Sequence, residues 1–227
     1  MDNPDEFRID LDPQPGRDFG DAITAALALR DVMAEAGLKA YAKTSGNRGI
    51  HVYARIKPTH EFQDVRHGVI GIARELERRM PELVTSAWWK EERGERVFVD
   101  FNQANRDRTI AAAYSPRPLP GAPVSTPLSW EELREATPSD FTIGTVPELL
   151  QQRECPWADI DAEPGQVARP TSSRHWGTGC SPPQRNMKPP RPTTRRSPRG
   201  SDVASCTGSG LRREDGRRTR CTRPSGW

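Results

Sequence analysis

The stretch FRIDLDPQPG, residues 7–16, alternates apolar and polar residues like a strand and then breaks at two prolines and a glycine. Because successive side chains of a strand point to opposite faces, Ile9 and Leu11 would face a core, and Asp10 and Asp12 would share the other face. Two carboxylates this close repel each other. They form either a solvated strand edge or a pair that holds a divalent cation.

Helix and strand patterns follow this strand in alternation. Apolar residues three and four apart predict the helices, which cover residues 18–37, 63–80, 129–136 and 145–153. Asp64 is the expected cap of the second helix, and Pro81 ends it. Further strands are predicted on both sides of the polar loop 45–49 and of the turn 93–95. The order β-α-β-β-α-β-β predicts an α+β fold with helices packed on one face of the sheet.

The two ends of the chain differ in charge. Residues 1–165 hold 20 Lys and Arg against 28 Asp and Glu, whereas residues 166–227 hold 14 against 3. Residues 1–165 are therefore expected to form the folded domain. Residues 166–227, rich in Arg, Pro and Ser, bury too little apolar surface and are expected to be a disordered basic tail. This tail is either a DNA-binding arm or the product of a shifted reading frame, in which case its charge is incidental.

Nothing in the sequence has the apolar run of a signal peptide or a membrane span, so a cytoplasmic protein is expected. The cysteines form no C-x-x-C pair, and neither a zinc site nor a disulfide framework is predicted from them. They are Cys155, Cys180, Cys206 and Cys221.

Two later stretches add polar residues to the aspartate pair. In KTSGNRGIHVYARI, alternation places His51 on the polar face of a strand that follows a loop with Ser45 and Arg48. In RVFVDFNQANRDR, Asp100 lies opposite the valines. If these strands are neighbours, three carboxylates and a histidine converge. Carboxylates of this kind hold Mg²⁺ or Mn²⁺, and nearby cations complement a triphosphate. The candidate cations are Arg48, Arg106, Arg108 and Arg117.

Each residue also has a simpler interpretation. His51 could be structural, Ser45 a turn residue and Asp100 a solvent-facing strand residue. The tryptophans Trp88, Trp89 and Trp130 are expected to pack rather than to stack on bases. A D-x-D strand also occurs in nucleotide-sugar transferases, although the segments around His51 and Asp100 argue against that class.

Taken together, three segments resemble the signature motifs of a known family. They are DLDPQPG (10–16), KTSGNRGIHVY (43–53) and WWKEERGERVFVDFNQANRDRTIAAAYSPRP (88–118). They are similar to those of the primase-polymerase domain of bacterial ligase D, the multifunctional end-joining DNA ligase, within the archaeo-eukaryotic primase superfamily. The resemblance extends from about residue 7 to about residue 165. It implies an RRM-like catalytic core with a mixed or antiparallel sheet.

The resemblance also implies roles for individual residues. Asp10, Asp12 and Asp100 would be the catalytic metal ligands. The incoming nucleotide would be bound by a second set, with Gln103 and Arg93 beside the nucleotide or template. This set is Ser45, Arg48, His51, Gln103, Arg117 and Arg93.

The implied reaction is template-directed addition of a nucleotide to a 3′-hydroxyl, with release of pyrophosphate and two Mn²⁺ or Mg²⁺ ions as cofactors. The implied partners are DNA with a 3′-hydroxyl end and a template, NTP or dNTP, and ligase and Ku-type end-binding proteins. This role in double-strand break repair would place the protein at the nucleoid in the cytoplasm.

The resemblance fails before the first motif. Family members carry a region there that supplies strands, a template-stacking aromatic residue and a grip on a DNA 5′-phosphate. Here residues 1–5 lead almost directly into the first strand. The 227-residue chain is therefore expected to be impaired as a polymerase. The alternative is a non-catalytic nucleic-acid-binding remnant that uses the basic tail, with binding that weakens as salt increases.

Overall fold

A six-stranded sheet organises residues 3–165, the part of the chain that the computed structural model describes. The spatial order is β4-β5-β1-β3-β2-β8. The β4–β5 pair is parallel and the other pairs are antiparallel, so the predicted α+β fold with a mixed sheet is confirmed. The strands are β1 (Glu6–Pro13), β2 (Tyr41–Thr44), β3 (Ile50–Arg55), β4 (Val84–Thr85), β5 (Val97–Asp100) and β8 (Pro127–Leu128).

β1 lies in the middle and is paired on both sides. Leu11 is opposite Ile50 of β3 and Val99 of β5, and all three are fully buried. The next position along, Asp10, is opposite His51 on one side and Asp100 on the other. The alternation read from the sequence therefore holds across three strands, with an apolar face towards the core and a polar face on the other side.

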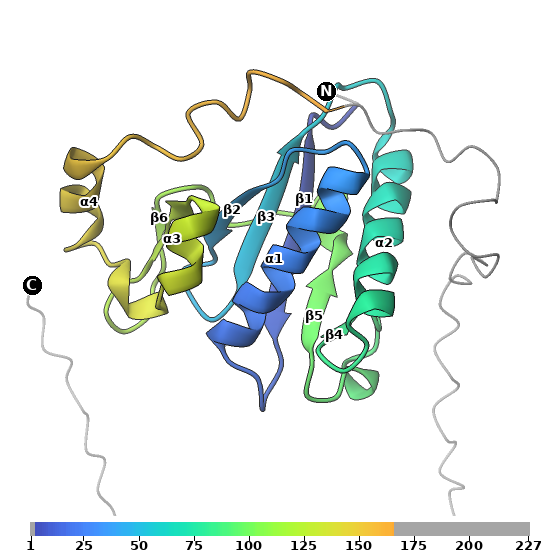
Figure 1. Cartoon of the computed structure of the whole chain (residues 1–227), viewed down its shortest axis with the longest axis horizontal. Coiled ribbons are helices and arrows are strands. Elements are labelled where there is room, and N and C mark those ends of the chain that lie inside the picture. The colour runs from blue at the N-terminus through green and yellow to red at the C-terminus, as the bar shows by residue number, and fades with distance from the viewer. Residues whose placement is uncertain (1–2, 166–227) are drawn as a thin grey trace, which may run out of the picture. The chain divides into compact units, whose positions relative to one another are not determined.

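Two long helices cover the apolar face of the sheet (Figure 1). Helix α1 (Phe19–Glu35) begins at a capping box, in which Asp18 and Asp21 accept each other's backbone N–H groups. It buries mainly small and apolar residues, which allow it to lie close to the strands. Helix α2 (Phe62–Arg79) places an apolar stripe on the same face and an Arg- and Glu-rich surface outwards.

Smaller elements complete the described part of the chain. The hairpin of β6 (Ser115–Pro116) and β7 (Val124–Ser125) precedes β8. The remaining helices are α3 (Trp130–Glu135), α4 (Val146–Gln152) and the 3-10 turns η1 (Lys90–Glu92), η2 (Phe101–Ala104) and η3 (Pro138–Asp140).

The segment after α4 covers one end of the polar face. Trp157 packs against Tyr41 and Tyr53, with ring centroids 6.4 and 5.1 Å apart, and its indole N–H donates to the Ala42 carbonyl at 3.0 Å. Arg55 forms an ion pair with Asp161 beside them. These contacts cover the part of the polar face that carries Tyr41 and Tyr53. The part that carries Asp10 and His51 is bordered by loops.

Two details differ from the sequence expectations. Asp64 is not the cap of α2, because the extended residue Glu61 holds that position and Asp64 lies in the first turn. There its charge still favours the helix N-terminus. The strand expected before the turn 93–95 shortens to β4, because Thr85 Oγ1 accepts the Ala87 N–H and turns the chain away.

The tryptophans differ in how exposed they are to solvent. Trp88 and Trp89 are exposed, but the Trp88 ring packs against Phe101 with centroids 6.1 Å apart. Trp130 is half-buried and donates to the Ala40 carbonyl at 3.1 Å. The predicted tail, 166–227, lies outside the described residues. No helix within residues 3–165 has the length and apolarity needed to cross a bilayer.

Leu29→Ala tests the assignment of α1 to the core. Leu29 is fully buried, so the truncation should lower the free energy of unfolding by about 2–5 kcal/mol. Leu150→Ala, at an exposed helical position, should change it by less than about 0.5 kcal/mol. Urea denaturation followed by tryptophan fluorescence measures both values. Equal effects would contradict the packing described here.

Candidate active site

The polar half-face brings together residues from three neighbouring strands. Asp10 and Asp12 project from β1, and the register places Asp100 and His51 on either side of Asp10. The His51 Nε2 atom lies 3.6 Å from Asp10 Oδ1. The convergence expected from the sequence is therefore present in the backbone pairing.

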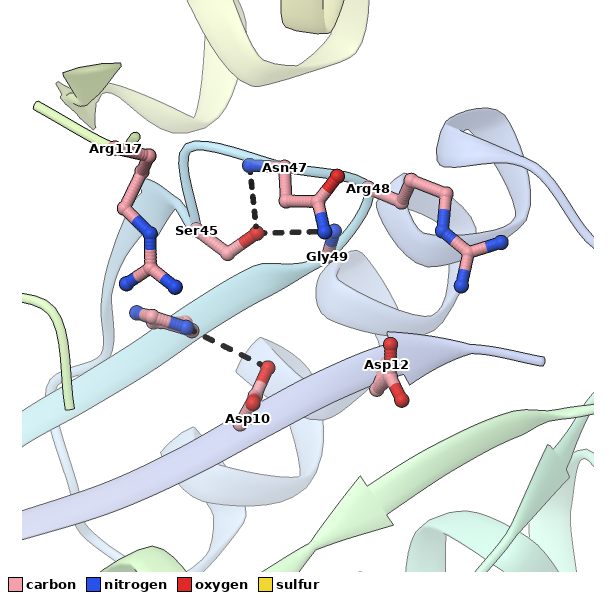
Figure 2. Close-up of a pocket in the computed structure, with 8 residues that line it drawn as sticks. Asp10, Asp12, Ser45, Asn47, Arg48, Gly49 and Arg117 are labelled. Atoms are coloured by element: carbon pink, nitrogen blue, oxygen red, sulfur yellow. Dashed lines mark hydrogen bonds and ion pairs between the residues drawn. The ribbon is translucent and has the colours of Figure 1, made fainter. Parts of the chain in front are cut away.

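A polar cavity of about 130 Å³ opens above Asp10 and Asp12. Figure 2 shows Asp10 and Asp12 on β1 beneath the loop 45–49, with Arg48 and Arg117 extending on opposite sides of that loop. The cavity is lined by Asp10, Asp12, Ser45, Asn47, Arg48, Gly49, His51 and Arg117. Carboxylates therefore form one side and guanidinium groups the other. We call this cavity the anion pocket because its cations and N–H groups suit a phosphate placed next to the carboxylates.

The loop 45–49 is shaped by its own hydrogen bonds and by close approach to its neighbours. Ser45 Oγ accepts the backbone N–H groups of Asn47 and Gly49 at 3.2 and 3.1 Å. A Cβ atom at Gly49 would lie 2.5 Å from the Leu11 carbonyl oxygen, so only glycine lets the loop enter β3 beside β1. Gly46 has φ +72°, and a Cβ atom there would lie 2.5 Å from Arg117 Cγ.

The surroundings of Asp10 disfavour the ionised form of its carboxyl group. Burial raises the pKa of its carboxyl to about 7, and repulsion from Asp12 and Asp100 acts in the same direction. Lys43 and Arg117 oppose this rise without cancelling it. The loss of hydration at Asp10 thus outweighs the support that the neighbouring cations give to its ionised form.

The other two carboxylates are held by local donors. Asp12 Oδ2 accepts from Gln14 Nε2 at 3.0 Å. Asp100 faces η2, where Oδ1 accepts the Asn102 backbone N–H at 2.9 Å and Oδ2 accepts from Gln103 Nε2 at 3.0 Å. Asp100 is thus next to Asp10 in the sheet but does not line the pocket. Within residues 3–165, no three His, Cys, Asp or Glu side chains are arranged closely enough to hold a metal ion.

His51 is buried and backed by a lysine that the sequence analysis did not select. Burial lowers the pKa of His51 to about 2, and Lys43 and Arg117 add to this effect. Lys43 Nζ lies 2.6 Å from His51 Nδ1 and 2.5 Å from Ser125 Oγ. A hairpin centred on Asn47 places Lys43 directly opposite His51, so counting the register across the loop could have identified it.

The remaining predicted residues lie in different places. Arg93 stacks 3.4 Å above the Phe98 ring and donates to the Ala87 and Trp88 carbonyls, so it orders the loop before β5 and does not line the pocket. Gln103 lies beside Asp100, and its buried Oε1 has no hydrogen-bond partner within the described residues.

Of the four arginines expected to complement a triphosphate, only Arg48 and Arg117 line the anion pocket. Arg106 and Arg108 instead line a second cavity beside Phe62, near the start of α2. The connection from η2 carries them to that side of the sheet.

Comparison with known proteins agrees with this geometry. Residues 1–157 match the family model described as LigD, primase-polymerase domain. The chain belongs to the LigD primase-polymerase domain family. This confirms the resemblance drawn from the three motifs.

Relatives of known name support the assignment. The multifunctional non-homologous end joining protein LigD of Pseudomonas aeruginosa is 32% identical over 162 residues, which are 70% of this chain and 19% of that protein. The bifunctional LigD of Bacillus subtilis is 33% identical over 163 residues, 71% of this chain and 27% of that protein. The chain thus spans about a fifth to a quarter of these relatives.

A solved structure shares the fold. It is the polymerase domain of Mycobacterium tuberculosis ligase D in complex with DNA, with a TM-score of 0.65 and 29% sequence identity. The match covers 71% of this chain and 56% of that one.

Gly49→Ala tests the close approach that forms the pocket. The added methyl group would collide with the Leu11 carbonyl, so the variant should be destabilised by about 1–3 kcal/mol. Gly71→Ala is the matched control. It meets open space within α2 and should stabilise the protein by up to about 1 kcal/mol. Thermal unfolding measures both effects, and a Gly49→Ala variant as stable as the wild type would contradict the geometry.

The raised pKa of Asp10 predicts that the free energy of unfolding depends on pH in metal-free buffer. The folded protein binds this proton more tightly than the unfolded chain, whose ordinary pKa is 3.8. The stability of the wild type relative to Asp10→Asn should therefore fall as the pH rises from about 4 to about 7. Above pH 7, Asp10→Asn should be more stable by up to about 4 kcal/mol. Urea denaturation in EDTA at several pH values measures this difference, and a constant difference would contradict it.

Proposed function

We propose that the site catalyses template-directed nucleotidyl transfer, in which the 3′-hydroxyl of a DNA end attacks the α-phosphate of an NTP or dNTP and pyrophosphate leaves. The observation that carries the proposal is the register of β5, β1 and β3. It sets Asp100, Asp10 and His51 side by side next to a phosphate-sized pocket. Membership of the LigD primase-polymerase family supports the same reaction.

The donor set fits a divalent cation in type and in charge. Asp10, Asp12 and Asp100 offer carboxylate oxygens, which Mg²⁺ and Mn²⁺ prefer. The raised pKa of Asp10 comes first from burial and then from repulsion by Asp12 and Asp100, and a bound cation would offset both effects. For Asp100 to join as a ligand, its carboxylate must exchange its hydrogen bonds to Asn102 and Gln103 for the cation. A pair of such ions would supply stabilisation of the attacking and leaving oxygens.

The chain's own residues bind and orient the triphosphate. Arg117 contributes a guanidinium whose buried Nε has no partner within the described residues. Arg48 is exposed on the opposite side of the loop. Ser45 Oγ already accepts two backbone N–H groups, and its hydrogen can therefore be donated to a phosphate oxygen. Such preorganised donors place charge stabilisation where the pyrophosphate departs.

DNA is the proposed macromolecular partner. The similar polymerase domain from Mycobacterium tuberculosis was solved with DNA, and the relatives are named as end-joining proteins. We therefore place this domain in double-strand break repair at the nucleoid, alongside ligase and Ku-type end-binding proteins. The hydrogen bonds that hold Asp100 away from the pocket favour the non-catalytic DNA-binding remnant as the second candidate.

Substitution of the aspartates decides between the two candidates. Incorporation of a nucleotide into a gapped duplex with Mn²⁺ should fall by at least about 100-fold in Asp10→Ala and Asp12→Ala, because loss of even an outer partner of a metal site costs 10–100-fold. Asp31→Ala, on the exposed surface of α1, is the matched control and should retain wild-type incorporation. Mn²⁺-dependent nucleotide binding should show the same pattern.

Equal incorporation by the wild type and both aspartate variants would reject the catalytic role. Salt-sensitive DNA binding that is lost on deletion of 166–227, with no Mn²⁺-dependent nucleotide binding, would identify the remnant instead.

A further inference from the structure

Lys43 is a buried lysine behind the anion pocket, and the proposed chemistry does not use it. Its relative exposure is 1%, and it is not among the residues that line the anion pocket. Lysine is rarely buried so completely unless its head group has partners. Here the partners are His51 Nδ1 at 2.6 Å and Ser125 Oγ at 2.5 Å.

The hydrogen bonds around Ser125 show which atom is the donor at each contact. The Ser125 hydroxyl donates to the Thr44 carbonyl at 2.6 Å, so its oxygen accepts from Lys43. Thr44 Oγ1 in turn donates to the Val124 carbonyl and accepts the Thr126 N–H, which fixes the segment carrying Ser125 against β2. Lys43 Nζ is thus held between two neighbours, and one of them can only accept from it.

The hydrogen-bond donors of Lys43 also determine which nitrogen of the His51 ring carries the hydrogen. An ammonium group has three hydrogen-bond donors and no acceptor. Burial lowers the pKa of Lys43 to about 7, so Lys43 is an ammonium below that pH. Its contact with His51 Nδ1 then requires Nδ1 to be the acceptor. A ring whose Nδ1 accepts is neutral and carries its hydrogen on Nε2. That nitrogen is on the side of Asp10 and the anion pocket.

We propose that protonated Lys43 is a positioning residue that holds His51 as the neutral Nε2–H tautomer, and so makes His51 a hydrogen-bond donor to an anion in the pocket. The role of that anion as a nucleotide phosphate rests on the proposed function. His51 then acts through a fixed N–H group and not as a proton-transferring acid. A fixed donor needs no reorganisation when negative charge develops near it.

The tautomer can be observed directly. In the full chain labelled with ¹⁵N-histidine at pH 6, where Lys43 is protonated, long-range ¹H–¹⁵N correlation spectra distinguish an Nε2–H ring from an Nδ1–H ring. His51→Gln identifies which of the four histidine signals belongs to His51. The wild type should show the Nε2–H pattern. An Nδ1–H or doubly protonated ring in the wild type would overturn the proposal without any variant.

Lys43→Met then tests whether the lysine causes this state. The methionine is similar in length and lacks the N–H donor, so the pure Nε2–H pattern should be lost. Affinity for a non-hydrolysable nucleoside triphosphate with Mn²⁺ should fall about tenfold, the loss expected for one hydrogen bond to a charged group. Lys39→Met, which removes an exposed lysine just before β2, should change neither. An unchanged His51 spectrum in folded Lys43→Met would also overturn the proposal.

The two readouts separate this proposal from the proposed function. If the wild type binds no nucleotide but shows the Nε2–H ring, and Lys43→Met loses it, the positioning role stands and the nucleotide function fails. If Lys43→Met changes the ring while nucleotide affinity stays the same, the part of the proposal that links the tautomer to the ligand is overturned.

Discussion

Pairing of β1 on both sides is the constraint on which the site depends. A strand with two hydrogen-bonded neighbours cannot shift by one residue without turning its apolar side chains to the wrong face. Ile9 and Leu11 are completely buried and resist that shift. The same register fixes Asp10 between His51 and Asp100, so the hydrophobic core on one face sets the positions of the charges on the other.

This arrangement concentrates negative charge at a cost to stability. Aspartates from adjacent strands repel one another, and burial at Asp10 adds the loss of hydration. Local donors reduce the repulsion: Gln14 holds Asp12, while Asn102 and Gln103 hold Asp100. The site therefore has two ways to balance its charge, through internal amides or through a bound cation. Under the proposed function, Asp100 would have to exchange these amide hydrogen bonds for the cation and reorient towards it.

The fold could be predicted largely because its signals are local. Alternation in residues 7–12 and 50–56 and the helical spacing of apolar residues identified the central strands and both long helices. Signals that depend on a single cap or turn were less reliable. The N-cap of α2 was misplaced at Asp64, and the segment after Val84 was expected to continue as a strand. In both places a neighbouring backbone group, which the sequence pattern does not specify, determines where the element begins or ends.

The pocket lining was predictable to the extent that its residues lie in the strand and loop segments singled out in the sequence. Asp10, Asp12, Ser45, Arg48, His51 and Arg117 all line the pocket, and they were identified by their chemical type within recognised segments. The buried layer behind them was not found, because Lys43 and Ser125 are 82 residues apart and meet only when the β6–β7 hairpin packs on β2. A lysine in a strand usually indicates an exposed position. Only the register with His51 shows that this one lies inside, where its donors act on the histidine and not on solvent.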